Sequence, residues 1–223
     1  MTELTAAQLI AEPARAAMLD LLMDGHAWPA GVLARRVGVA PSTASEHLAR
    51  LAAGGLVAVE PNGRERRYRL ASPHVADALE ALARIDRDSP VRTLRESSRK
   101  VALRDARTCY DHLAGRLGVA ITDALVERGA LVVRDTSFDL TDDGEAFLMD
   151  RLWVDVAAAR SGSRAFARAC LDWTERRPHL AGALGAALAR SLLDRDWVRR
   201  RPGDRGLVVT PSGEAGLAEA LGI

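Results

Sequence analysis

Apolar residues recur three and four positions apart through much of the first 88 residues of the chain. Leu19 and Leu22 have this helical spacing, and Pro13 precedes them at a position where a first-turn proline loses no hydrogen bond. Gly38 and the pair Gly54-Gly55 each follow such a stretch directly, as glycines that end helices do. The pattern predicts four helices, over residues 12–24, 29–37, 41–53 and 73–87.

Between the third and fourth predicted helices, the residue types change to those of strands. Two β-prone runs, 56–60 and 64–70, flank a short segment that contains Asn62-Gly63. Asn-Gly is a preferred sequence for a two-residue hairpin turn, because both residues tolerate a positive φ. We therefore predict a β-hairpin over residues 56–70.

The second half of the chain contains an internal repeat. His112-Leu-Ala-Gly-Arg-Leu-Gly118 returns as His179-Leu-Ala-Gly-Ala-Leu-Gly185, 67 residues later. Each copy continues with a Leu-rich stretch, a hydrophobic strand and a threonine (in LTDDGE at 140–145 and VTPSGE at 209–214) that is expected to cap a further helix. We interpret the copies as two helix–helix–hairpin units that pack as one domain.

Ser89-Pro90 interrupts the helical pattern, because proline disfavours helix in the residue before it. The sequence therefore predicts a first domain over residues 1–88, a linker over 89–98 and a second domain over 99–223. The expected fold class is mainly α with short β-hairpins, an α+β arrangement.

Three helices, a hairpin and a further helix form the element order of a winged helix-turn-helix. A closer resemblance is carried by Glu12-Pro-Ala-Arg15, Leu33-Ala34, Ser42-Thr43-Ala44-Ser45-Glu46-His47-Leu48, Gly55-Leu56-Val57 and Gly63-Arg64-Glu65-Arg66-Arg67-Tyr68. In this order and spacing, residues 5–85 resemble the ArsR/SmtB family of bacterial repressors. The resemblance implies a sequence-specific DNA-binding transcription regulator, a repressor that a signal releases from its operator.

The third predicted helix has the residues of a recognition helix. Short polar side chains near its start let the backbone approach bases and phosphates, and His47 adds a longer donor that we expect on an exposed face. The hairpin carries arginines suited to the phosphate backbone or the minor groove. The predicted DNA contacts are Ser42, Thr43, Ser45, His47 and Arg50 in the helix, Arg64, Arg66 and Arg67 in the hairpin, and Arg35 and Arg36 before the helix.

Two departures from the ArsR/SmtB pattern concern metal binding. Metal sensors of that family carry paired cysteines before the recognition helix, whereas residues 31–36 of this chain contain no thiol. The family's other site lies on the last helix, where this chain offers only His74, Asp77 and Glu80. One chain thus supplies too few ligands there for tetrahedral zinc.

The two cysteines lie in the second domain, each before a copy of the repeated Leu-Ala-Gly. Cys109 and His112 stand three positions apart, which predicts a shared helix face, and Cys170 precedes His179, with Pro178 opening the repeat helix. If the repeats pack with pseudo-twofold symmetry, the pairs converge on a Cys₂His₂ site suited to Zn²⁺, and a cuprous ion or haem would also accept such ligands. A metal or redox sensor and a plain structural core are both compatible with these residues.

The last helix of the first domain carries an apolar stripe at Leu79, Leu82 and Ile85, which predicts a homodimer interface. A twofold dimer would bind double-stranded DNA at a palindromic operator. The effector is expected to be a metal or a small molecule, with Trp153, Trp173 and Trp197 as candidate lining of an apolar pocket or as core. Its signal would pass through residues 88–108.

Composition narrows the classes of function. The 31 basic and 30 acidic residues give a net charge of +1, so any DNA affinity has to come from local clusters. The chain lacks the common phosphate-loop, serine-hydrolase and zinc-protease motifs, which argues against an enzyme. It also lacks a signal peptide and an apolar run of about 18 residues, so we expect a cytoplasmic protein with no membrane contact. The alternative function is a winged-helix protein-interaction adaptor that does not bind DNA, and the basic hairpin argues against it.

Overall fold

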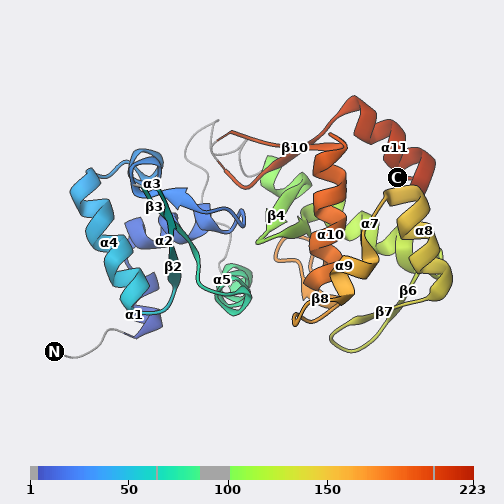
Figure 1. The fold of residues 1–223 in the computed structure, drawn as a ribbon, viewed down its shortest axis with the longest axis horizontal. Coiled ribbons are helices and arrows are strands. Elements are labelled where there is room, and N and C mark those ends of the chain that lie inside the picture. The colour runs from blue at the N-terminus through green and yellow to red at the C-terminus, as the bar shows by residue number, and fades with distance from the viewer. Residues whose placement is uncertain (1–4, 64, 86–100, 203) are drawn as a thin grey trace. The chain divides into compact units, whose positions relative to one another are not determined.

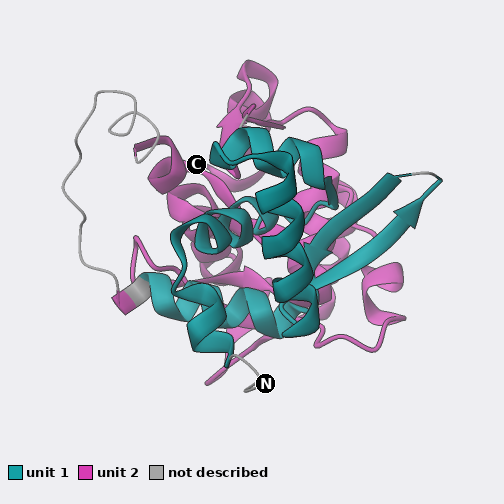
Figure 2. Cartoon of the chain, turned by 90° about the vertical axis from the view of Figure 1, so that its left-hand side faces the viewer, with its two compact units in different colours: residues 1–83 teal, residues 84–223 magenta. Residues whose placement is uncertain are grey.

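The computed structural model describes residues 5–63, 65–85, 101–202 and 204–223 (Figure 1). The chain forms two compact units, residues 1–83 and 84–223, which Figure 2 colours separately. The linker predicted over 89–98 lies outside the described residues.

The N-terminal unit contains the predicted helices. Side chains at helical spacing close its core, and Leu19, Leu33, Leu48 and Leu51 are fully buried. Gly38 ends one helix in the left-handed conformation, with φ at 79°, as the sequence predicted. The four predicted helices are α2 (Pro13–Leu22), α3 (Ala30–Val37), α4 (Pro41–Ala53) and α5 (Pro73–Ile85), and an additional short helix, α1 (Ala6–Ile10), was not predicted.

The predicted hairpin forms the wing of this unit. Strands β2 (Val57–Asn62) and β3 (Glu65–Leu70) pair antiparallel, and Tyr68 turns inward to the core. A two-residue strand, β1 (Trp28–Pro29), adds to β3, so the sheet order is β1-β3-β2. The confirmed order of helices and hairpin makes this unit a winged helix-turn-helix.

The C-terminal unit repeats one element order twice, and each copy begins with a hairpin. The predicted order of helix, helix and hairpin is therefore wrong. The first copy contains β4 (Arg107–Cys109), β5 (His112–Ala114), α7 (Gly115–Glu127), β6 (Leu131–Val133), β7 (Phe138–Leu140) and α8 (Asp142–Leu152), with α9 (Val156–Arg160) after it. The second contains β8 (Arg168–Leu171), β9 (Pro178–Ala181), α10 (Gly182–Asp194), β10 (Val198–Arg200), β11 (Leu207–Val209) and α11 (Pro211–Leu221).

The two copies exchange packing partners. Helix α7 contacts β9, and α10 contacts β5, so each helix packs on the first hairpin of the other copy. One apolar core, including Leu125, Leu148, Leu184 and Leu192, runs through both copies. The predicted threonine caps are confirmed, because Thr141 accepts from the amide of Gly144 and Thr210 from that of Gly213.

Candidate DNA interface and metal centre

The N-terminus of α4 is open to a ligand. Pro41 occupies the first turn, and Ala40 at the N-cap has no side-chain acceptor for the first amides of the helix. Ser42 and Ser45 are exposed and Thr43 is half-buried, while the hydroxyl of Ser45 donates to the carbonyl of Pro41 at 2.9 Å. Small side chains and uncapped amides let a helix start approach phosphates and base edges closely.

The arginines predicted to contact DNA are mostly at the surface. Arg50 pairs with Glu46 one turn earlier at 2.5 Å, and Arg36 lies over the ring of Trp28 at 4.2 Å. Arg35 and Arg66 are exposed, and Arg67 on β3 lies 3.5 Å from Glu65. Arg64 lies outside the described residues.

His47 does not lie on an exposed face, so that part of the prediction is wrong. Only 15% of its side chain is exposed, and its Nε2 lies 3.7 Å from a carboxylate oxygen of Glu12. Glu12 accepts hydrogen bonds from the first amides of α2, at Ala14 and Arg15. His47 therefore packs α4 against the start of α2. Burial would raise the pKa of Glu12, but these hydrogen bonds and His47 hold it below its usual value.

In the C-terminal unit, both Cys/His pairs lie on β-hairpins. Cys109 pairs with His112 across the turn of β4 and β5, and Cys170 pairs with His179 across β8 and β9. The shared helix face predicted for Cys109 and His112 is wrong, because a two-residue turn also brings positions i and i+3 side by side. Pro178 opens a strand, a position that needs no amide donor, and α10 starts only at Gly182.

The two hairpins bring the four side chains to one point. Sγ of Cys109 lies 3.9 Å from Sγ of Cys170, and Nε2 of His112 lies 3.1 Å from Nε2 of His179. All four residues are buried, and one ligand atom from each lies within 4.8 Å of the others. Among the described residues, this is the group of histidine, cysteine and carboxylate side chains that could hold a metal ion.

The sulfur–sulfur and nitrogen–nitrogen spacings fit a single tetrahedral ion. Around Zn²⁺, two thiolates at about 2.3 Å from the metal stand about 3.8 Å apart, and two imidazole nitrogens at about 2.0–2.1 Å stand about 3.3 Å apart. The observed separations lie within a few tenths of an ångström of both values. A buried cluster this tight leaves no room for a porphyrin, so the arrangement fits an ion and not haem.

Several groups at the cluster have shifted pKa values. Hydrogen bonds from Cys109 and the two histidines outweigh burial and lower the pKa of Cys170, which favours the thiolate that binds metals. Burial would lower the pKa of His179, but Asp172 and Cys170 raise it above its ordinary value. Asp111 lies 3.5 Å from Nδ1 of His112, and its pKa is lowered by His112 and Arg164 against the opposing effect of burial.

Sequence reasoning missed one residue beside the cluster. Asp172 is fully buried, and its Oδ2 lies 3.3 Å from Nδ1 of His179 and 2.9 Å from the guanidinium of Arg107. Burial raises the pKa of this carboxyl, but His179, Arg107 and Thr174 hold it well below its usual range. The signal that could have found Asp172 is the unequal spacing of the repeat, since the cysteines are 61 residues apart and the histidines 67.

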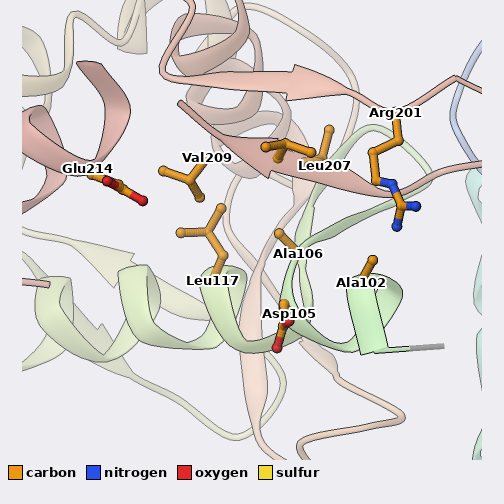
Figure 3. A pocket seen from close by; sticks show the side chains of 9 residues that line it. Ala102, Asp105, Ala106, Leu117, Arg201, Leu207, Val209 and Glu214 are labelled. Atoms are coloured by element: carbon orange, nitrogen blue, oxygen red, sulfur yellow. The ribbon is translucent and has the colours of Figure 1, made fainter. Parts of the chain in front are cut away.

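The three tryptophans, which the sequence left as pocket lining or as core, make aromatic and cation–π contacts. Trp153 and Trp197 meet edge to face at 5.9 Å, and Trp173 lies 4.8 Å from the guanidinium of Arg107. A cavity of about 400 Å³ lies elsewhere in the C-terminal unit (Figure 3), and it is lined by Ala102, Asp105, Ala106, Leu117, Arg201, Leu207, Val208, Val209 and Glu214.

Comparison with known proteins agrees with this description. A helix-turn-helix domain family matches residues 10–60. The chain is 43% identical to the uncharacterized HTH-type transcriptional regulator YdfF of Bacillus subtilis, over 96% of this chain and 95% of that protein. It is also 40% identical to the HTH-type transcriptional regulator CmtR of Mycobacterium tuberculosis, over 36% of this chain and 71% of that one.

Among solved structures, the homodimeric winged helix-turn-helix domain of Mb0332 from Mycobacterium bovis is 30% identical. The match covers 35% of this chain and 71% of that one, with a TM-score of 0.32.

The chain is therefore a DNA-binding transcription regulator. It belongs to the HTH-type transcriptional regulators, and the match to the helix-turn-helix domain family lies in its N-terminal unit. Within the part of the chain that the structure describes, no helix has the length and apolar character needed to cross a membrane.

Proposed function

We propose that the chain is a homodimeric repressor whose affinity for operator DNA changes when a metal ion binds Cys109, His112, Cys170 and His179. The observation that carries this proposal is the convergence of two thiols and two imidazole nitrogens within 4.8 Å. Zn²⁺ is the first candidate because the spacing suits its tetrahedral geometry, and Cu⁺ is the second because thiolates also select it. Four protein ligands leave no open position for a substrate, which supports sensing or structure over catalysis.

The DNA contacts of this proposal come from α4 and the wing. Ser42, Thr43 and Ser45 at the open start of α4 would reach base edges in the major groove. Arg66 and Arg67, with Arg64 beside them in the sequence, would follow the backbone or the minor groove. Arg35, Arg36 and Arg50 would contact phosphates. His47 would support α4 from behind through its contact with Glu12.

The dimer would form through α5. Leu82 is 48% exposed and Ile85 is 76% exposed in the single chain, on a helix that buries Ala76 and Glu80. An exposed apolar stripe of this kind marks an interaction surface, and a second copy of the same helix matches it. Twofold symmetry would place two α4 helices on half-sites about 34–36 Å apart.

The test is operator binding by the purified full-length protein, measured by fluorescence anisotropy at fixed salt with DNA from its own promoter. The protein is first stripped with chelator and reductant and then given Zn²⁺ or Cu⁺, and bound metal is measured by elemental analysis. We expect one ion per chain and a change in operator affinity of about 5-fold or more.

Cys109→Ser should keep its basal DNA affinity and lose the response to metal. Thr108→Ser is the matched control, because Thr108 is buried beside Cys109 in β4 without belonging to the cluster. A wild-type protein that binds neither ion would refute the metal proposal. Absence of salt-dependent DNA binding would instead favour the adaptor alternative.

A further inference from the structure

The second hairpin of the repeat has an insertion that the first lacks. The cysteines are separated by 61 residues and the histidines by 67, so the segment between Cys170 and His179 is six residues longer than the two-residue turn between Cys109 and His112. The longer loop contains Asp172, Thr174 and Glu175. The repeat is therefore asymmetric at the point where it meets the metal cluster.

Asp172 uses both carboxylate oxygens inside the protein. Oδ1 accepts from the amide and the hydroxyl of Thr174, at 2.9 and 2.7 Å, and from the amide of Glu175 at 3.1 Å. Oδ2 accepts from Arg107 and, at 2.7 Å, from the amide of Gly115 at the start of α7. The same oxygen lies 3.3 Å from Nδ1 of His179, a buried nitrogen that has no hydrogen-bond partner in the described structure.

Arg107 extends this network away from the cluster. Its side chain is fully buried, and its Nη1 donates to the carbonyl of Leu103 at 3.0 Å and to the hydroxyl of Thr174 at 3.2 Å. Leu103 lies in the helical residues 101–105, the first described part of the C-terminal unit after residue 85. Contacts therefore run from His179 through Asp172 and Arg107 to the backbone of the segment that follows the connection between the units.

We propose that Asp172 is the positioning residue of the metal centre, and that through Arg107 it transmits occupancy of the centre to residues 101–106. A metal-bound imidazole commonly gives its other N–H to a carboxylate, which fixes the ring and strengthens the ligand. If Nε2 of His179 binds the ion, Nδ1 carries the proton, and Asp172 is placed to accept a hydrogen bond from this N–H. This inference rests on the proposed function, because it requires the four residues to bind a metal.

The other histidine provides an internal comparison. Asp111 lies beside His112, but its side chain is 27% exposed and its ion-pair partner Arg164 is at the surface. Asp172 and Arg107 are completely buried. Removing Asp172 should therefore disturb the metal centre far more than removing Asp111.

Three variants of the full-length chain test the inference. Asp111→Asn is the matched control, and Asp172→Asn removes the buried carboxylate. A lone buried Arg107 would destabilise the fold. The double variant Asp172→Asn/Arg107→Met therefore removes both charges and places an apolar side chain at position 107. Metal affinity is measured with Co²⁺, whose absorption reports tetrahedral thiolate coordination, and with Zn²⁺ in competition. Thermal unfolding of the metal-free proteins reports stability.

We expect Asp172→Asn to weaken Zn²⁺ binding about 10–100-fold and to alter the Co²⁺ spectrum, with a smaller effect for Asp111→Asn. The double variant should recover stability while its metal affinity stays low. Zn²⁺ should slow hydrogen exchange of the amides of residues 101–106 in the wild type. In the double variant, Zn²⁺ should leave the exchange rates of these amides unchanged.

Recovery of affinity together with stability in the double variant would show that Asp172 is merely structural and overturn the inference. Affinity in Asp172→Asn equal to that of the wild type would do the same. A wild type that binds neither Co²⁺ nor Zn²⁺ would instead remove the proposed function itself.

Discussion

Nε2 of His112 lies 3.1 Å from Nε2 of His179, across a separation of 67 residues. The same distance in sequence separates the two copies of the repeat, so equivalent positions of the two copies meet here. Each copy supplies one thiol and one imidazole. Neither copy alone provides enough ligands for a tetrahedral ion, and a bound ion would join them.

Removal of metal should therefore loosen the C-terminal unit. At a free Zn²⁺ concentration of 100 times the dissociation constant, binding stabilises the folded state by about 2.7 kcal/mol. For a unit of this size, that corresponds to a melting temperature about 5–10 °C higher with the ion than without it. Differential scanning calorimetry with zinc and with chelator measures the shift. Cys170→Ser is the control, because this variant lacks one proposed ligand. Its melting temperature should be the same with zinc and with chelator.

Gly185→Ala should damage the centre although it replaces none of the proposed ligands. A Cβ at Gly185 would lie 2.4 Å from the carbonyl oxygen of Leu180 and 3.3 Å from Cβ of His112. Helix α10 would have to move from the hairpins, at a cost of about 1–3 kcal/mol in unfolding free energy. Denaturant unfolding and Zn²⁺ titration should both show a loss. Gly162→Ala is the control, because its added Cβ meets only an atom at 4.0 Å, and equal behaviour of the two variants would contradict the packing argument.

The wing and the recognition helix should respond differently to mutation. Arg66→Ala should weaken binding to all DNA sequences and reduce the slope of log affinity against log salt by about one. Thr43→Ala should instead relax selection at one base pair, at a cost of about 1–3 kcal/mol in binding free energy. Anisotropy titrations over a series of salt concentrations and operator variants separate the effects. Arg190→Ala, at an exposed arginine of α10, is the control. Loss of specificity in Arg66→Ala would reverse the assignment.

Charge on α5 should break the dimer. Leu82→Glu/Ile85→Glu places two carboxylates on the exposed apolar stripe, and we expect the dimer dissociation constant to rise at least about tenfold, because burying unpaired charges is costly. Light scattering measures the mass, and operator affinity should fall with it. Met149→Glu, at a half-exposed position on α8, controls for the added charge. A double variant that stays dimeric would place the interface elsewhere.

The N-terminal unit was predictable because its signals are local. Helical spacing and Gly38 each act within a few residues, and the structure has the corresponding helices. The hairpin is also present, but the predicted Asn62-Gly63 turn is wrong, because Asn62 ends β2 and pairs with Glu65. The strand β1 was missed because two residues, Trp28 and Pro29, carry no alternating pattern. His47 was misplaced because helical spacing alone does not reveal that Glu12, on another helix, faces it.

In the C-terminal unit, the sequence indicated the candidate ligands but not their secondary structure. Cys109 and His112 at i and i+3 fit one face of a helix as well as the two sides of a tight turn, and Tyr110, with φ at 61°, forms the turn. Asp172 had no local signal, because its role depends on Arg107, 65 residues earlier in the chain. Long-range contacts of this kind decide the surroundings of the centre.

Because both Cys/His pairs lie in one chain, the proposed metal binding would depend little on the amount of protein. A centre shared between two separate molecules fills more readily as those molecules become more abundant. Here the second Cys/His pair is held beside the first by the fold, so its effective concentration is fixed. The ion concentration at which such a centre fills is then the same whether a cell holds few copies of the regulator or many.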